Sequence, residues 1–330
     1  MTTLWDVTGT DVVKALAAER RLSGSVSSGL ALTLVVVVDE KRVDQAEAAA
    51  TRAAAQHPCR LLVVVRRRPD APEPRLDAEV LIGGRLGPGE AVVMRMYGRL
   101  ALHAESVVLP LLAPDAPVVT WWFGEPPSEV AHDPLGVIAD RRITDCANAA
   151  DPVAALHARA VDYAPGDTDL AWARTTLWRG LCASAFDSLE SPATSVVVTG
   201  EGSNPSRALL AGWLSSRLGL QVRTEDSAGP GVTGVRVELD GCLLDITRND
   251  GRTATLARTD QPDRAMPLPR RDLGDLLAEE LRRLDSDETY AEALEAATGQ
   301  RRLSERAAVR TYVWQDPARG AAPDPALAIS

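Results

Sequence analysis

The hydrophobic residues in the first third of the chain form short continuous runs rather than an alternating pattern. Residues 30–38 and 59–65 are apolar apart from Thr33 and Arg60 and are rich in β-branched side chains, and an Ala-rich stretch at 41–56 lies between them. Continuous runs of this length are typical of strands buried on both faces. The order strand, helix, strand predicts two neighbouring parallel strands, and a helix is expected before them at 11–22.

Turn residues separate the next predicted strands. Segment 83–89, GGRLGPG, looks at first like a phosphate-binding loop. It is not followed by the Lys-Ser or Lys-Thr pair of such a loop, and its Pro-Gly pair is typical of a type II turn. A hairpin that connects strands at 79–82 and 91–96 is therefore favoured.

Apolar residues next recur at helical spacing between Leu100 and Leu112. The spacing predicts one helix with a strongly apolar face, which Pro110 must kink or end. Two further strands are predicted, one at 117–123 and a shorter one at 141–145.

The second half of the chain has a different order of elements. Asn204 and Pro205 suit the N-cap and the first position of a helix, and Asp240-Gly241 suits a two-residue hairpin turn. The elements expected here are a strand at 195–199, a helix at 205–218, an antiparallel meander from residue 235, and helices at 272–284 and 288–298.

These patterns predict an α/β fold with two domains. The first, at 1–189, is expected to contain a mixed, partly parallel sheet. The second, at 190–315, is expected to combine a strand-helix unit with the antiparallel meander. Residues 316–330 are rich in Pro, Ala and Gly and are expected to form a mobile tail.

The charge balance limits the classes of partner. Lys and Arg number 36 against 46 Asp and Glu, which gives a formal net charge of −10 at pH 7. A field of this sign repels phosphate backbones and anionic membranes, so nucleic-acid binding is disfavoured. No apolar run approaches the roughly 20 residues that span a bilayer. The N-terminus has no export signal, so neither a membrane segment nor export is expected.

Side chains that could carry chemistry are scattered along the sequence. Cys59, Cys146, Cys182 and Cys242 lie far apart and form no C-x-x-C pair. The four histidines lie outside any G-x-S-x-G or H-E-x-x-H motif. We therefore expect no catalytic residue, metal or cofactor, and a reducing cytoplasm as the location.

One strand-to-helix turn leaves a second possibility open. It contains Gly200, Gly202, Ser203 and Asn204. The acidic pair 225–226 ends the next predicted strand, about where a ribose-binding acid stands in a dinucleotide fold. The third glycine of that fingerprint is missing and Glu201 would repel a pyrophosphate, so a helix-capping loop is favoured over phosphate binding.

Tryptophan and arginine concentrate in one segment. Four of the seven tryptophans lie between residues 121 and 178, and both residue types are enriched at protein interfaces. If 169–186 forms one helix capped by Asp167, Trp172 lies about 120° from Trp178 around its axis. Either this helix is buried nearly all round, or Trp172 and Arg179 present a stacked pair to another surface.

Four unusual strings identify a family resemblance. They are GPGE at 87–90, LPLLAPDAPVV at 109–119 followed by Trp121-Trp122, RRITD at 141–145, and YAPGDTDLAW at 163–172. Through them the chain resembles, nearly from end to end, the actinobacterial glucose-6-phosphate dehydrogenase assembly proteins of the OpcA family. The resemblance implies a non-catalytic protein that binds this NADP-dependent dehydrogenase of the oxidative pentose phosphate pathway. It also implies that binding promotes the active oligomeric state, as an allosteric activator does.

We therefore expect partner contacts in the Trp/Arg-rich segment. The candidate contact residues are Trp121, Trp122, Arg141, Arg142, Asp145, Asp167, Asp169, Trp172 and Arg179. The competing interpretation is a metabolite-binding or dinucleotide-dependent α/β enzyme that uses the turn at 200–206. A phosphorylated ligand that stabilises the isolated protein against heat would favour this alternative.

Overall fold

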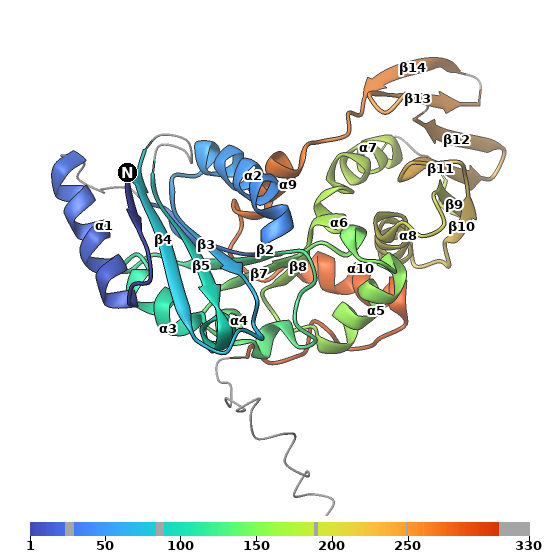
Figure 1. Ribbon diagram of the computed structural model, residues 1–330. Helices are drawn as coiled ribbons and strands as arrows, with labels where there is room; N and C mark the ends of the chain where they lie inside the picture. The colour runs from blue at the N-terminus through green and yellow to red at the C-terminus, as the bar shows by residue number, and fades with distance from the viewer. Residues whose placement is uncertain (24–29, 84–88, 188–190, 249, 260, 310–330) are drawn as a thin grey trace, which may run out of the picture.

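The computed structural model describes residues 1–23, 30–83, 89–187, 191–248, 250–259 and 261–309. The described strands form two mixed sheets, one of eight strands and one of six, with helices packed on them (Figure 1). The predicted α/β class is confirmed. The expected tail at 316–330 and the turn residues 84–88 lie outside the described residues.

The elements have the following bounds. The strands are β1 (Thr2–Leu4), β2 (Leu32–Asp39), β3 (Cys59–Arg66), β4 (Arg75–Ile82), β5 (Glu90–Tyr97), β6 (Val118–Phe123), β7 (Arg141–Thr144), β8 (Asp167–Asp169), β9 (Ala193–Gly200), β10 (Arg223–Asp226), β11 (Val232–Leu239), β12 (Cys242–Thr247), β13 (Thr253–Arg258) and β14 (Gln261–Pro267). The α-helices are α1 (Gly9–Ser23), α2 (Val43–Gln56), α3 (Glu105–Val108), α4 (Pro134–Val137), α5 (Pro152–Asp162), α6 (Leu170–Ala173), α7 (Thr176–Phe186), α8 (Pro205–Leu218), α9 (Leu273–Glu280) and α10 (Glu288–Thr298). Five short 3-10 helices complete them: η1 (Glu40–Arg42), η2 (Gly98–Leu102), η3 (Leu109–Leu111), η4 (Val130–His132) and η5 (Cys146–Asn148).

The first sheet is built around the predicted β-α-β unit. Its strand order is β1-β4-β5-β3-β2-β6-β7-β8, and β2 pairs in parallel with β3 on one side and β6 on the other. The expected hairpin is confirmed by the antiparallel pairing of β4 and β5. Because β2 lies in the middle of a parallel array, its Leu-Val run is covered on both faces.

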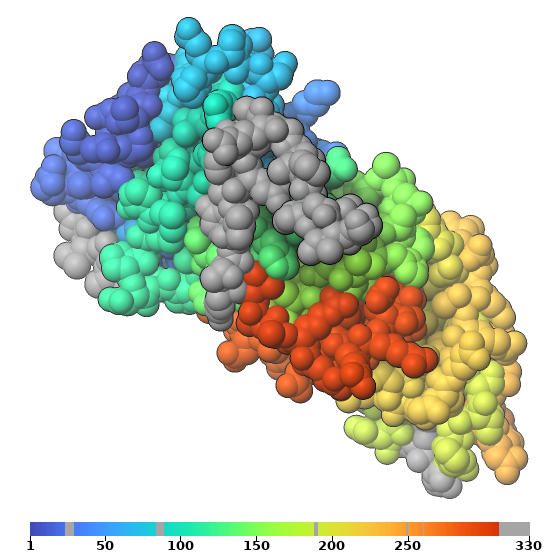
Figure 2. Space-filling view, turned by 90° about the horizontal axis from the view of Figure 1, so that it is seen from below, coloured from blue at the N-terminus to red at the C-terminus, as the bar shows by residue number. Residues whose placement is uncertain are grey.

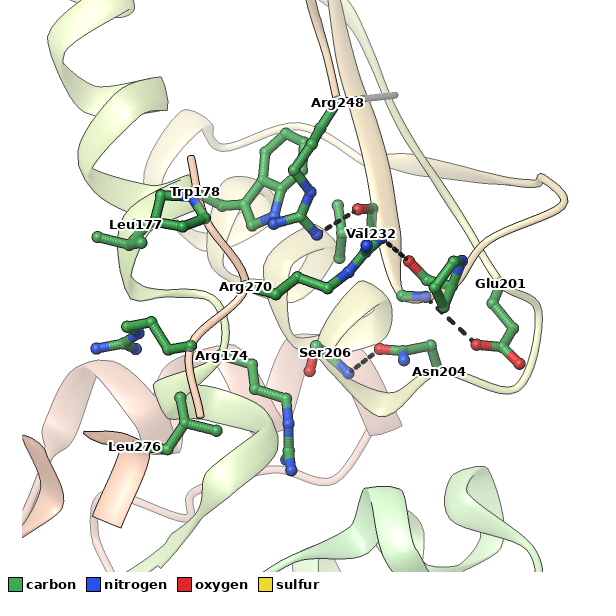
Figure 3. Close-up of a pocket in the computed structure, with 14 residues that line it drawn as sticks. Arg174, Leu177, Trp178, Glu201, Asn204, Ser206, Val232, Arg248, Arg270 and Leu276 are labelled. Carbon is green, nitrogen blue, oxygen red and sulfur yellow. Dashed lines mark hydrogen bonds between the residues drawn. The ribbon is translucent and has the colours of Figure 1, made fainter. Parts of the chain in front are cut away.

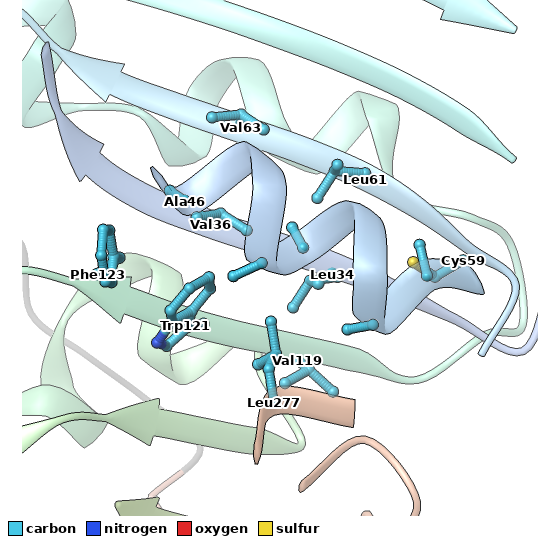
Figure 4. Packing of buried hydrophobic residues seen from close by; sticks show 14 of the residues in the cluster. Leu34, Val36, Ala46, Cys59, Leu61, Val63, Val119, Trp121, Phe123 and Leu277 are labelled. Atoms are coloured by element: carbon cyan, nitrogen blue, oxygen red, sulfur yellow. The ribbon is translucent and has the colours of Figure 1, made fainter. Parts of the chain in front are cut away.

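Alternating side chains of the central strands fill two separate cores. Val36 and Trp121 face α2 and Leu277 of α9, as Figure 4 shows. Val37 and Trp122 belong to the core on the other face of the sheet, which α1 covers. Because successive strand residues point to opposite faces, the two adjacent tryptophans pack into different cores.

The segment expected to form one helix over residues 100–112 is broken into η2, α3 and η3, so that prediction is wrong. His103 leaves the helical region, with φ −122° and ψ 40°, between the first two pieces. Pro110 has no N–H to donate, so the α-helical bonding of α3 cannot continue through it, and Pro110 stands instead in the first turn of η3. The apolar periodicity still identifies the buried side, because Ala104, Val107 and Leu111 all lie in the core.

The second sheet has the order β10-β9-β11-β12-β13-β14, in which β9 and β10 pair in parallel and the other neighbours are antiparallel. The predicted meander is confirmed. Leu239 pairs with Cys242 across the Asp240-Gly241 turn, and Gly241 has a φ of 72°, which glycine adopts without strain. Helices α7 and α8 contribute Trp178, Leu210 and other side chains to the core on this sheet.

After β14 the chain returns to both sheets. Helix α9 packs against α2 of the first sheet, and α10 packs against α8 and α5. Figure 2 shows α10 and the residues after it in red. They lie between a green surface, which includes α5, and a yellow surface, which belongs to α8 and the second sheet. Helices α8 and α10 approach closely at Gly212, where a Cβ would lie 2.2 Å from the Ala293 carbonyl oxygen. The boundary between domains at residue 189 stays a prediction.

Candidate functional site

Two predicted contact residues on β7 form ion pairs inside the molecule. Arg141, 2% exposed, donates through Nη2 to Glu280 and through Nη1 to the Asp285 carbonyl oxygen at 2.8 Å. Arg142, also 2% exposed, donates through Nε to Asp167. Their charges are therefore balanced within the chain, and the two pairs tie β7 to α9 and to β8.

Two predicted acidic residues have similar internal partners. The Asp145 carboxylate accepts hydrogen bonds from Arg174 at 2.6 and 2.8 Å, and burial raises the pKa of Asp145. Asp169 accepts from the Thr144 hydroxyl at 2.6 Å and from the Cys146 backbone N–H at 3.0 Å. Both carboxylates stabilise the carboxyl ends of β7 and β8, where backbone donors would otherwise be unpaired.

Asp162, at the end of α5, gives a testable pH dependence. It accepts the Val130 backbone N–H at 3.0 Å and lies 3.3 Å from Arg159, and burial raises its pKa from an ordinary 3.8 to about 6. Because the pKa is raised on folding, the contribution of Asp162 to stability is fully present below about pH 4 and is lost as pH rises through about 6.

Asp162→Asn cannot ionise, so it escapes this loss. We expect the unfolding free energy of the variant, relative to that of the original protein, to rise by about 2 to 3 kcal/mol between about pH 4 and about pH 7. Urea unfolding of both proteins at the two pH values measures the difference. A difference that does not change with pH would contradict the assigned burial of the carboxylate.

Trp172 and Arg179 form the stacked pair that the sequence left as one of two alternatives. The Arg179 guanidinium carbon lies 3.6 Å from the centroid of the Trp172 ring. Trp172 is nevertheless only 1% exposed, and its Nε1 donates to Asp287 at 2.9 Å. Each alternative therefore holds in part: the tryptophan is buried within the chain, and the partly exposed arginine covers it.

The segment that positions this pair differs from the prediction of one helix over 169–186. Asp169, rather than Asp167, caps the short helix α6, and α7 begins only at Thr176. Between them the Thr175 N–H and hydroxyl both bond to the Trp172 carbonyl oxygen, at 2.9 and 2.7 Å. This local bonding replaces the i−4 bond of an α-helix and turns the chain.

The predicted contact residues differ in exposure. Asp167 and Arg179 are partly exposed. The other seven, Trp121, Trp122, Arg141, Arg142, Asp145, Asp169 and Trp172, are buried. Buried side chains support a surface rather than form it, so the direct contact role of these residues stays a prediction.

A polar hollow of about 370 Å³ lies over the Trp172–Arg179 pair. Its lining also includes Arg141 and Glu280, so it brings together side chains from β7, α6, α7 and α9. Arg282 and Arg283 lie on its exposed rim, and within the described residues neither has a carboxylate within 4.0 Å. We call this surface the α9 rim hollow.

The turn between β9 and α8 has the expected capping geometry. Asn204 Oδ1 accepts the Ser206 backbone N–H at 3.0 Å, and Pro205 occupies the first turn. Arg207 lies behind the turn, where it donates to the Gly202 carbonyl oxygen at 2.9 Å and pairs with Asp226 at the end of β10. Asp226 therefore stands where the sequence expected an acid, and its charge is paired with Arg207.

A cavity of about 250 Å³ begins at this turn (Figure 3). Of the four residues named for the turn, Asn204 lines it, and Glu201 and Ser206 of the same 200–206 turn line it as well. Arg248 and Arg270 also line it, and sequence reasoning missed both. No local motif marks these arginines, because one follows β12, the other follows β14, and only the fold brings them together.

Other chemistry is limited in the described part of the chain. There, no group of three or more His, Cys, Asp or Glu side chains is arranged to hold a metal ion. Burial raises the pKa of the Cys59 and Cys182 thiols to about 12. Among the same residues, no helix has the length and apolar character needed to cross a membrane.

Comparison with known families identifies the chain. A family model described as the glucose-6-phosphate dehydrogenase subunit N-terminal domain matches residues 50–161. A second, described as the C-terminal domain of the same subunit, matches residues 165–294. The chain belongs to the OpcA family. The two OpcA matches meet just before β8, so the second begins with the segment that carries Trp172 and Arg179.

Solved structures resemble this OpcA-family chain only distantly, and no curated protein sequence matches it. A mutant of KijD10, a 3-ketoreductase from Actinomadura kijaniata in complex with TDP-benzene and NADP, is 12% identical with a TM-score of 0.44, over 83% of this chain and 96% of that one. UDP-N-acetylglucosamine 3-dehydrogenase GnnA from Acidithiobacillus ferrooxidans is 10% identical with a TM-score of 0.37, over 82% and 96%. An oxidoreductase from Sinorhizobium meliloti is 11% identical with a TM-score of 0.37, over 80% and 86%. Likenesses of this size carry no inference about chemistry.

Proposed function

We propose that this OpcA-family chain binds glucose-6-phosphate dehydrogenase in the cytoplasm and promotes its active oligomeric state, without catalysing a reaction of its own. The observation that supports this most directly is the match of both family domains, in order, over residues 50–161 and 165–294. Both are described as domains of a glucose-6-phosphate dehydrogenase subunit. For this reason we propose glucose-6-phosphate dehydrogenase as the partner of the chain.

An activator of this kind must discriminate between states of its partner. It has to bind the competent dehydrogenase more tightly than the incompetent form, because equal affinity for both would shift no population. The dehydrogenase itself would catalyse the first oxidative step of the pentose phosphate pathway. The chain described here would contribute only binding energy.

We place the contact at the α9 rim hollow. Arg282 and Arg283 are exposed there, and Arg179 covers the buried Trp172 beside them. Arginine on a rigid aromatic support is typical of residues that dominate protein interfaces. The buried ion pairs Arg141–Glu280 and Arg142–Asp167 would hold this surface in shape.

A charge reversal at the rim tests the assignment. Arg283→Glu is expected to weaken binding to purified dehydrogenase about tenfold or more, since like or unpaired charge at an interface is costly. Arg21→Glu is the matched control, because Arg21 is also exposed, has no ion-pair partner among the described residues, and lies on α1 at the far side of the first sheet (Figure 1). Titration of the labelled dehydrogenase measures both. Equal affinities for the two variants would remove the rim from the proposal, and absence of binding by the original chain would overturn the proposed function.

A further inference from the structure

The cavity at the start of α8 lies where four segments meet. It is lined by Trp178 of α7, Ser206 of α8, Val232 of β11, and the segment 269–271 that leads to α9. Figure 3 shows Arg248 and Arg270 on the Val232 side of the space, with Ser206 and Asn204 at the first turn of α8. The cavity therefore has a cationic side and the positive end of a 14-residue helix.

The arginines around the cavity fall into two classes. Arg174 is paired with Asp145, and Arg271 is paired with Glu279. Arg248 and Arg270 have only carbonyl partners in the described residues: Arg248 donates to Leu268 and Val232, and Arg270 donates to Pro230. Among the described residues, neither of these two positive charges has a carboxylate within 4.0 Å, and Asp250 acts on Arg248 only from a greater distance.

Two polar atoms in the cavity wall have no hydrogen-bond partner. They are Ser206 Oγ and Arg248 Nε, on side chains of residues that are 4% and 7% exposed. Leaving a buried donor unpaired costs free energy that a bound acceptor would recover. Burial and the neighbouring Arg270 also lower the pKa of Arg248 to about 10, a perturbation that an anion would oppose.

We propose that this cavity binds the phosphoryl group of a small phosphorylated metabolite, with Arg248 and Arg270 as its cationic partners and Ser206 as a hydroxyl donor. A phosphate monoester carries about −1.5 to −2 charges near neutral pH, which matches two unpaired guanidinium groups. Arginine also presents paired N–H donors that suit phosphate oxygens.

The size and walls of the cavity favour a metabolite over a bare ion. Its volume of about 250 Å³ is several times the roughly 30 Å³ of one water molecule. Leu177, Trp178 and Leu276 supply an apolar wall for the part of the ligand beyond the phosphoryl group. The Arg248 guanidinium carbon lies 5.0 Å from the Trp178 ring centroid, which fixes the arginine at this wall. Glu201 is the acidic lining residue, and it accepts the Gly231 N–H at 3.3 Å.

Titration of the isolated full-length chain with inorganic phosphate and with phenyl phosphate tests the site. We expect calorimetry to detect both, with phenyl phosphate bound more tightly because its ring can occupy the apolar wall. Arg270→Gln is expected to weaken phenyl phosphate binding about tenfold or more, by loss of a charged hydrogen bond. Arg264→Gln, on the exposed strand β14, is the matched control and should bind like the original chain.

A second variant keeps the test informative if Arg270→Gln destabilises the fold. Ser206→Ala removes the unpaired hydroxyl but keeps the backbone N–H that Asn204 accepts, and it should weaken phenyl phosphate several-fold. The proposal is overturned if the original chain binds neither phosphate compound, if Ser206→Ala binds as tightly as the original chain, or if acetate binds as tightly as inorganic phosphate. No dehydrogenase is present in this experiment, so its outcome is independent of the proposed function.

Discussion

Replacing Glu280 with leucine is expected to lower the free energy of unfolding by about 3 to 5 kcal/mol. Glu280 is 4% exposed and accepts from Arg141, which is 2% exposed. Without the carboxylate, the arginine keeps its charge in the core with only the Asp285 carbonyl oxygen as acceptor. An uncompensated buried charge is costly because the interior solvates it poorly.

The double variant Arg141→Met with Glu280→Leu separates charge from packing. It removes both charges and also the Arg141 Nε, which has no partner, so its stability should lie within about 1 kcal/mol of the original value. Urea unfolding of the single and double variants measures both quantities. Equal loss in the two variants would show that packing, rather than the unpaired charge, sets the cost.

Trp172→Ala is expected to lower the free energy of unfolding by about 3 to 5 kcal/mol, as for other large-to-small core substitutions. The ring is 1% exposed, lies 5.9 Å from the Tyr290 ring between centroids, and supports the Arg179 guanidinium. Its removal leaves a cavity where α6, α7 and α10 meet and frees Asp287 from its indole donor.

Two controls define the cause of that loss. Trp172→Phe keeps an aromatic ring and loses mainly the Nε1–H donation to Asp287, so it should cost about 1 to 2 kcal/mol. Trp5→Ala removes a tryptophan that is 66% exposed and should change stability by less than about 0.5 kcal/mol. Chemical unfolding followed by circular dichroism compares the three variants. A loss at Trp172 no larger than at Trp5 would contradict the buried position of the ring.

The strands were predictable because the residues that each strand buries are consecutive in the sequence. The runs that became β2 and β3 are nearly continuous in Leu and Val, interrupted inside the strands only by Thr33 and Arg60. Runs of this length and composition are typical of a strand covered on both faces. The start of helix α8 was equally clear, since Asn204 and Pro205 mark its N-terminus. The structure ends it at Gly219, which has a φ of 66°.

The helical predictions failed where local hydrogen bonds compete with the helix. Thr175 splits the predicted helix at 169–186, and His103 with Pro110 divides the segment 100–112. Apolar spacing reports which side is buried, and it does so for a chain of short turns as well as for one helix. Periodicity alone therefore could not place the ends of α3, α6 and α7.

The candidate sites depend on residues that are remote in sequence. Arg141 pairs with Glu280, which lies 139 positions later in the sequence. This pairing is buried, so Arg141 belongs to the core, although the sequence indicated a contact residue. Arg248 and Arg270 meet Ser206 only because the meander folds back on α8. A single sequence could indicate that Trp and Arg concentrate here, but not which of them the fold would bury.

One activity titration can measure both the binding and the activation that we propose for this chain. Purified glucose-6-phosphate dehydrogenase is held at a fixed low concentration while this chain is added in increasing amounts, and the oligomeric state of each mixture is measured by light scattering. We predict that activity rises to a plateau and that the dehydrogenase shifts to a larger, defined assembly at the same ratio. Unchanged activity and unchanged mass at every ratio would show that the chain neither assembles nor activates the dehydrogenase. Turnover of glucose 6-phosphate by the chain alone would show that it is itself an enzyme.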